Sequence, residues 1–309
     1  MITTQLPLSD GTKLRLGRWE PGPGAVCGSV LLLQGREEFL EKYNETAADF
    51  VRRGWRVVSF DWRGQGLSTR ALPQRQRGYV KDYRLYLDDL DAVIHHALPP
   101  DGKPILLFAH SMGGHIALRY LLEGNHARHF RGAILCSPML NIHARPFPSV
   151  LARGIARLAV VLGLGSHYAP TQGDYSPAKA LYTPANRLTT DPKRFAMTHQ
   201  FIALNPDLAL GGATYGWLDA TFRSIKALTL ALKIQAKSLS LPILILSTPQ
   251  DRVVCAGNHE GLAQALPRAE IHHYPDGQHE LMMESDGIRA RIWRDLDVFI
   301  AKIMASPPR

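Results

Sequence analysis

Five short runs of almost uninterrupted apolar residues recur along this chain of 309 residues. They are SVLLLQ (29–34), WRVVSF (55–60), PILLFA (104–109), GAILCS (132–137) and PILILS (242–247). Short runs without a polar face are typical of parallel strands that are buried on both sides. TKLRLGRW (12–19) alternates like a half-buried strand, and AEIHHY (269–274) is predicted as the last strand.

Helical patterns fill the spaces between these runs, at 37–54, 82–98, 112–124, 258–266 and 286–304. The alternation predicts an α/β fold whose mostly parallel central sheet is covered by helices on both faces. It is interrupted after Asn141, and as far as about Ser240 the chain shows helical segments and no convincing buried strand. We therefore expect one domain, 1–309, with a core of 1–141 and 241–309 and a helical insertion at 142–240.

Composition argues against several classes of protein. No apolar stretch is long enough for a membrane span, and the first twenty residues lack the features of a signal peptide. Cys27, Cys136 and Cys255 lie in neither CxxC nor zinc-type spacing, which suits free thiols in a cytoplasmic protein. The net charge of +9 could attract an anionic membrane surface, but no nucleic-acid motif accompanies it, and we expect no nucleic-acid partner.

The stretch LFAHSMGGH (107–115) places Ser111 between a predicted strand and a predicted helix. Strand, tight bend and helix form the context of a nucleophile elbow, which lifts a serine oxygen clear of the sheet. Small residues two before and two after, Ala109 and Gly113, let the strand and helix approach closely, although G-x-S-x-G is the usual form. The alternative is a serine N-cap with no chemical role.

A serine nucleophile needs a base. The chain has thirteen histidines, and their places in the predicted fold distinguish them. His279 lies in a glycine-containing loop, YPDGQHEL, directly after the last predicted strand, where an imidazole can reach the serine. The alternative is an ordinary exposed loop histidine. The other candidates are expected elsewhere. His110 and His115 should be packed beside the elbow, His95 and His96 should lie on a helix surface, and His272 and His273 should lie within the last strand.

The base in turn needs a carboxylate to fix its tautomer. Asp251 follows the buried run 242–247 in a predicted turn, where an aspartate with no role beyond the turn is also common. Asp61 and Asp276 are rival candidates. The chain order Ser111, Asp251, His279 is the order found in α/β-hydrolases, and each residue follows a predicted strand at its carboxyl end.

Acyl transfer also requires donors to the tetrahedral oxyanion, generally two backbone N–H groups. Met112 directly follows the serine and is expected to supply one. In LLLQGREEF, Gly35 permits a tight turn, and the N–H of Arg36 is expected to supply the other. The Arg36 side chain is either a solvated surface charge or a contact for an anionic substrate group.

These residues resemble the α/β-hydrolase superfamily, in particular its lysophospholipase and monoacylglycerol lipase branch of serine aminopeptidase-like hydrolases. The resemblance is carried by QGREEFLEKY, FDWRGQGLS (60–68), HSMGG, the Asp251 loop and GQHELMMES. The branch usually has His-Gly where this chain has Gln34-Gly35, as in lysophospholipase L2-like sequences, and Ala109 replaces the first elbow glycine. The resemblance implies that FDWRGQGLS is structural and that 142–240 is a cap over the site, shaping the acyl pocket.

Two segments of the insertion fit such a cap. PSVLARGIARLAVVLGLG (148–165) is strongly apolar, with Arg145, Arg153 and Arg157 near its start. Such a helix lies on a membrane surface, admits a lipid tail, or packs its apolar face on the core. GWLDATFRSIKALTLAL (216–232) is a second amphipathic helix, and its aromatic residues either line an acyl pocket or serve as packing.

Together these features predict a serine hydrolase that cleaves carboxylic esters through an acyl-enzyme. The resemblance implies lysophospholipids or monoacylglycerols as substrates, and we expect no cofactor and no metal. The alternatives are a peptidase or acyltransferase using the same three residues, or a non-catalytic ligand-binding protein with this fold. The protein is expected to be cytoplasmic, and possible contact with a membrane would be peripheral and transient.

Overall fold

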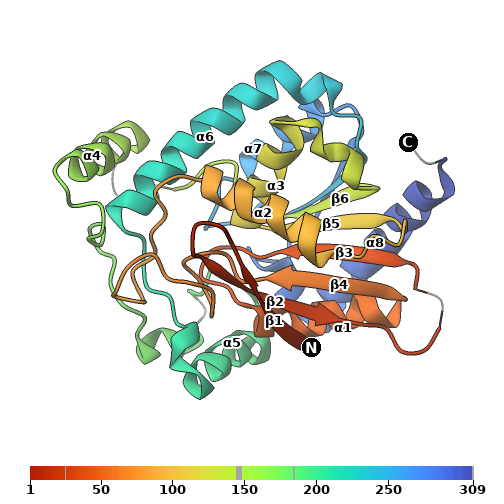
Figure 1. Ribbon diagram of the computed structural model, residues 1–309, viewed down its shortest axis with the longest axis horizontal. Helices are drawn as coiled ribbons and strands as arrows, with labels where there is room; N and C mark the ends of the chain where they lie inside the picture. The colour runs from red at the N-terminus through yellow and green to blue at the C-terminus, as the bar shows by residue number, and fades with distance from the viewer. Residues whose placement is uncertain (25, 144–147, 184, 308–309) are drawn as a thin grey trace.

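The computed structural model describes residues 1–24, 26–143, 148–183 and 185–307, and its centre is one eight-stranded sheet (Figure 1). The strand order is β1-β2-β4-β3-β5-β6-β7-β8, and all neighbours are parallel except β1 with β2 and β2 with β4. The strands are β1 (Ile2–Pro7), β2 (Lys13–Trp19), β3 (Gly28–Leu33), β4 (Trp55–Phe60), β5 (Ile105–His110), β6 (Gly132–Cys136), β7 (Ile243–Ser247) and β8 (Ala269–His273). The predicted sheet is confirmed.

Helices cover both faces of the sheet, as predicted (Figure 1). Within β3, Leu31 and Leu33 belong to one buried cluster and Val30 and Leu32 to the other, which explains the uninterrupted apolar run. The first cluster includes side chains from α2 (Arg84–Ala97), α3 (Met112–Leu122) and α7 (Gly257–Ala265). The second includes side chains from α1 (Asn44–Arg52) and α8 (Asp286–Ala305).

Two details differ from the prediction. Strand β1 was not expected, because its residues are mostly exposed and carry no apolar run. The helix expected from residue 37 begins only at Asn44, after a turn and the short 3-10 helix η1 (Leu40–Tyr43). His272 and His273 lie within the last strand, as expected; they are partly exposed at the sheet edge and pair with Asp295 of α8 at 3.1 Å and with Glu260 of α7 at 2.6 Å.

Along the chain, the segment between β6 and β7 contains three helices, α4 (Ser149–Val161), α5 (Pro192–Leu204) and α6 (Tyr215–Gln235) (Figure 1). The described part of 142–240 contains no strand beyond isolated bridges. Arg145 lies outside the described residues. The remaining short 3-10 helices are η2 (Asn125–His129), η3 (Pro177–Ala180), η4 (Pro206–Leu208), η5 (Ala236–Ser238) and η6 (Leu281–Met283).

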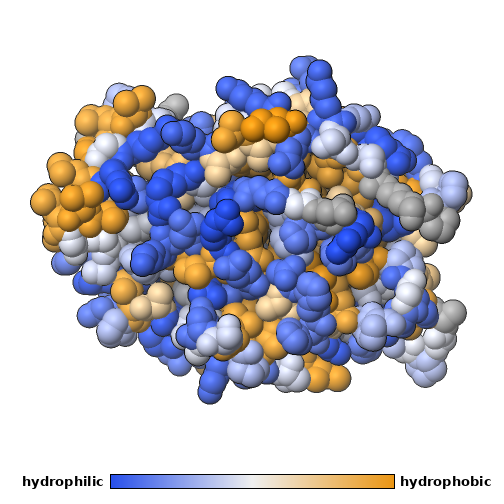
Figure 2. Space-filling view, turned by 45° about the horizontal axis from the view of Figure 1, so that its top comes forward, coloured by the Kyte–Doolittle hydropathy of each residue, from blue (hydrophilic) through white to orange (hydrophobic). Residues whose placement is uncertain are grey.

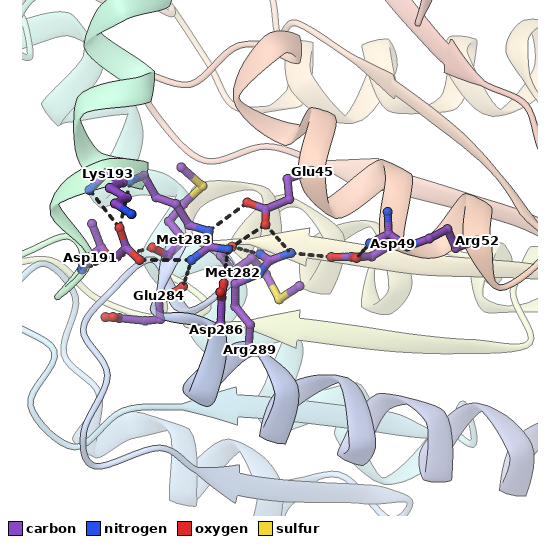
Figure 3. A network of polar contacts seen from close by, with 12 residues as sticks. Glu45, Asp49, Arg52, Asp191, Lys193, Met282, Met283, Glu284, Asp286 and Arg289 are labelled. Carbon is purple, nitrogen blue, oxygen red and sulfur yellow. Dashed lines mark hydrogen bonds and ion pairs between the residues drawn. The ribbon is translucent and has the colours of Figure 1, made fainter.

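A network of charged groups ties α5 to the core (Figure 3). Arg194 of α5 donates to Glu45 of α1 at 2.8 and 2.7 Å and to Asp286 of α8 at 2.6 Å. Arg289 extends this network from α8 to Asp49 on α1.

Among the described residues, no helix combines the length and the apolar character needed to cross a bilayer.

Candidate active site

Ser111 occupies the bend between β5 and α3, with φ 50° and ψ −115°. This conformation is strained for a residue other than glycine, and such strain is concentrated at functional sites. The bend is fixed by the Ser111 N–H, which donates to the Cys136 carbonyl at 3.0 Å. A Cβ on Gly113 would lie 2.6 Å from the carbonyl oxygens of Leu33 and Gln34, so glycine is needed for α3 to approach β3.

The three predicted side chains form one hydrogen-bonded chain. His279 Nε2 lies 2.9 Å from Ser111 Oγ, and His279 Nδ1 lies 2.6 Å from Asp251 Oδ2. All three residues are buried, and Ser111 makes no capping hydrogen bond to α3. They follow β5, β7 and β8 at the carboxyl edge of the parallel strands, where open α/β sheets place their sites.

Asp251 is held in position by the backbone as well as by His279. Its second oxygen accepts the N–H groups of Val253 at 2.8 Å and Val254 at 2.9 Å. Burial favours a raised pKa, but the hydrogen bond and charge interaction with His279 and these two amides outweigh burial, so the pKa of Asp251 lies below its ordinary value. The carboxylate is therefore ionised at neutral pH and able to fix the orientation of the imidazole.

The rival acids have other partners. Asp61 is buried and pairs with Arg15 at 2.7 Å while accepting the Leu67 N–H, so it anchors the FDWRGQGLS turn. Asp276 is exposed and pairs with Arg291 at 3.0 Å. As expected, His110 and His115 are buried beside the elbow, and His95 and His96 are exposed on α2.

The turn after β3 is held by the neighbouring segment. Trp62 donates its indole N–H to the Gln34 carbonyl at 2.9 Å. Gln65 donates to the Gly35 carbonyl at 3.0 Å and accepts the Glu37 N–H at 3.2 Å. FDWRGQGLS therefore fixes the turn that carries the Arg36 N–H.

The two backbone donors expected at an oxyanion remain unused. Neither the Arg36 N–H nor the Met112 N–H has a hydrogen-bond acceptor among the described residues. Met112 is the first residue of α3, where N–H groups have no partner within the helix. The neighbouring Gly35 N–H is bound to the carboxylate of Glu38.

A buried polar network that the sequence analysis missed lies behind the site. Glu38 accepts from Lys42 at 2.7 Å and from the Tyr43 hydroxyl at 2.6 Å, and Lys42 also contacts Glu280 at 2.6 Å. His110 Nδ1 lies 3.2 Å from Glu38, and all five residues are buried. The only hint in the sequence was the Glu38–Lys42 spacing, which places opposite charges one helical turn apart.

The charges of this network stabilise one another. Burial opposes ionisation of Glu38, but Lys42 and His110 hold the pKa of that carboxyl well below its usual range. Burial also opposes the charge on Lys42 and on His110. Glu280 and Glu38 raise the pKa of Lys42, and the same two carboxylates raise the pKa of His110.

A cavity of about 350 Å³ adjoins the turn after β3 (34–37), here called the oxyanion turn after its expected role, and the Asp251 loop, with Arg36 and Val253 in its lining. Most of its wall is apolar, and helices α4 and α6 and the loops around them contribute to it. The aromatic residues of the second amphipathic segment, Trp217 and Phe222, both line it and are also buried, Trp217 within the first core cluster, so they serve in packing as well.

Comparison with known proteins identifies a family and relatives for this chain. The family described as "Serine aminopeptidase, S33" matches residues 24–286. The chain is 33% identical to a probable lysophospholipase L2 from Haemophilus influenzae over 89% of this chain and 84% of that protein. It is 22% identical to a monoglyceride lipase from Saccharomyces cerevisiae over 95% of this chain and 91% of that protein.

Solved structures show the same fold. A soluble variant of the Saccharomyces cerevisiae monoglyceride lipase, in complex with a substrate analog, superposes with a TM-score of 0.74 at 20% identity, covering 98% of this chain and 97% of that chain. A thermostable carboxyl esterase from Bacillus coagulans gives a TM-score of 0.72 at 19% identity, covering 98% and 99%. With its sheet, its sequence relatives and its matched family, the chain belongs to the serine aminopeptidase S33 family of α/β-hydrolases.

Proposed function

We propose that the protein hydrolyses the carboxylic ester of lysophospholipids or monoacylglycerols, with Ser111, His279 and Asp251 as its catalytic residues. The hydrogen-bonded chain from Ser111 Oγ through the imidazole to Asp251 is the observation that carries the proposal. The activities by which the related lysophospholipase and monoglyceride lipase are named supply the substrate class.

The reaction follows from the positions of these groups. His279 Nε2 takes the Ser111 proton as Oγ attacks the ester carbonyl, while Asp251 stabilises the imidazolium that forms. The N–H groups of Arg36 and Met112 bind the oxyanion. The imidazolium then protonates the leaving alcohol, and an acyl-serine remains. Water, activated by His279, attacks this acyl-enzyme and releases the fatty acid, which restores the serine.

Residues 142–240 serve as a cap over the site in this proposal. Helices α4 and α6 supply much of the apolar part of the cavity wall, which suits an acyl chain. The outer face of α4 exposes Val150, Leu151, Leu158, Val161 and Leu162 beside Arg153 and Arg157. Figure 2 shows apolar side chains gathered at this end of the molecule. We propose that this face meets an anionic membrane surface in a peripheral contact.

Peptide hydrolysis is the second candidate, because the matched family is named for a serine aminopeptidase. A free α-ammonium group is best bound by a carboxylate. The described residues lining the cavity include Arg36 and no Asp or Glu, which favours an ester substrate over an amino-terminal one.

The test is a substrate panel assayed with the full chain: a lysophospholipid and a monoacylglycerol of the same acyl chain, a short acyl ester, and an aminoacyl amide. Turnover of the lipid esters well above the amide is expected. Preferred cleavage of the amide, or no cleavage of any ester by folded protein, would contradict the proposal. The expectations of a cytoplasmic location and of no metal or cofactor stay predictions.

A further inference from the structure

Arg36 is not a solvated surface charge. Its side chain is only 16% exposed, and its guanidinium carbon lies 4.7 Å from the centre of the Trp217 ring on α6. Nη2 donates to the Gly211 carbonyl at 3.0 Å, and Nη1 contacts the half-exposed carboxylate of Glu37. The guanidinium is therefore held at the boundary between the oxyanion turn and the helices that line the cavity.

The hydrogen-bonding capacity of this guanidinium is incompletely used. Its Nε is buried and has no acceptor among the described residues. An unpaired buried donor is unfavourable, and more so when it belongs to a charged group. Glu37 is the sole carboxylate among the described residues that pairs with Arg36, and it lies outside the cavity lining. An anionic ligand would supply the Arg36 guanidinium with the acceptors that it lacks.

The cavity itself is amphipathic. The side chains of Ala152, Ile155, Ala156, Leu218 and Phe222 make one part of its wall apolar. Arg36, His143, Thr171, Gln172 and Tyr215 supply polar groups to the rest. Gln172 lies near Arg36, because its Oε1 accepts the Ala213 N–H at 3.3 Å, close to the Gly211 carbonyl that Arg36 contacts. Such a cavity fits a ligand with an acyl chain and a polar, negatively charged group.

From these contacts we infer that the Arg36 side chain binds the phosphodiester of a lysophospholipid head group and makes the enzyme prefer lysophospholipids to monoacylglycerols. The inference rests on the proposed ester hydrolysis and adds the group that selects the substrate. In a lysophospholipid only the glycerol backbone separates the ester from the phosphate. A cation on the same residue as an oxyanion N–H is therefore well placed to contact that phosphate. Arginine also matches phosphate geometry, since its fork donates two parallel hydrogen bonds.

The first test compares kcat/KM for 1-oleoyl lysophosphatidylethanolamine and 1-oleoylglycerol, which share the scissile ester. Replacing Arg36 with Met keeps the backbone N–H and much of the stem but removes the charge. The lysophospholipid-to-monoacylglycerol ratio is expected to fall about tenfold, the usual effect of losing a charge-assisted hydrogen bond. An unchanged ratio in Arg36→Met would overturn the inference, because a merely structural arginine would affect both substrates alike.

Arg77 offers a matched control. Its guanidinium also lies over an aromatic ring, 5.6 Å from the centre of Tyr168, and donates to a backbone carbonyl, that of Ser166, at 3.4 Å. It does not line the cavity. Arg77→Met should therefore leave the substrate ratio at the parent value, and a fall equal to that of Arg36→Met would overturn the inference.

A second test uses the parent chain and needs no turnover. Short-chain ether analogues, kept below their micelle concentrations, carry no ester to cleave, and their binding is measured by calorimetry. The ether lysophospholipid should bind about tenfold more tightly than the alkylglycerol of the same chain. Equal binding would overturn the inference and leave ester hydrolysis intact. Absence of all ester hydrolysis would instead overturn the proposed function, whichever ether binds better.

Discussion

The ammonium group of Lys42 lies 2.6 Å from the carboxylate of Glu280, the residue that directly follows His279. Lys42 also contacts Glu38, which accepts the Gly35 N–H of the oxyanion turn. One buried cation thus joins the turn that we propose binds the oxyanion to the loop that carries His279. The chain couples two parts of the site through a residue that does not contact the serine.

Replacing Lys42 with Met should lower stability by about 3–5 kcal/mol, because two buried carboxylates lose their shared partner. We expect kcat to fall more than KM rises, since the oxyanion turn and the base lose their relative positions. Urea unfolding and ester kinetics measure both effects. In Lys42→Met/Glu280→Gln one of the two carboxylates is neutral, so that the loss of stability should be smaller. If the free energy of unfolding of Lys42→Met lay within about 1 kcal/mol of the parent value, this role of Lys42 would be refuted.

His110 should make stability depend on pH. Its Nδ1 lies 3.2 Å from Glu38 and its Nε2 lies 3.3 Å from the His279 carbonyl, so both nitrogens face acceptors and only the imidazolium donates to both. Its pKa is raised in the folded protein above the ordinary 6.5. The resulting stabilisation is fully present below pH 6.5 and is lost as pH rises through the folded pKa.

Comparison with His110→Gln isolates this effect. The parent's advantage in free energy of unfolding should be largest near pH 6 and should shrink toward pH 9, over the range set by the raised pKa. Denaturant titrations of both proteins across this range provide the measurement. An advantage that is constant with pH, or one that grows with pH, would contradict a pKa of His110 that is raised by folding.

Asp251→Asn should reduce kcat by about 10⁴-fold without unfolding the protein. An amide cannot stabilise the imidazolium and favours the wrong tautomer of His279. Ester kinetics on protein with an unchanged melting temperature measure the loss. Asp276→Asn is a suitable control, because that carboxylate is exposed and pairs with Arg291 instead. Equal activity of the two variants would exclude Asp251 from the reaction.

The proposed membrane contact depends on the exposed face of α4. Leu158 and Leu162 are 59% and 64% exposed, so a glutamate at either position should weaken binding to anionic vesicles with little effect on stability. Leu204 at the end of α5 is 83% exposed, at a different part of the molecule, and Leu204→Glu is the control (Figure 1). Vesicle sedimentation measures the binding, and equal loss in all variants would contradict a specific role for α4.

The sequence was sufficient to predict the sheet and the three candidate catalytic residues, because periodicity and strand ends are local signals. Strand β1 was not predicted, because an exposed antiparallel edge strand needs no apolar run. The Glu38–Lys42–Glu280 network was not predicted for a different reason. Glu38 and Lys42 look like an ordinary helical ion pair on a surface, and only the tertiary fold buries them beside Glu280. The Arg36 side chain was likewise ambiguous until α6 was placed against it.

The central claim is that Ser111 is the nucleophile, and mass spectrometry of the protein after exposure to a fluorophosphonate tests it most directly. One adduct is expected, located on the peptide that contains Ser111, and none on folded Ser111→Ala protein. An adduct on another residue, or unchanged labelling and ester turnover in Ser111→Ala, would contradict it.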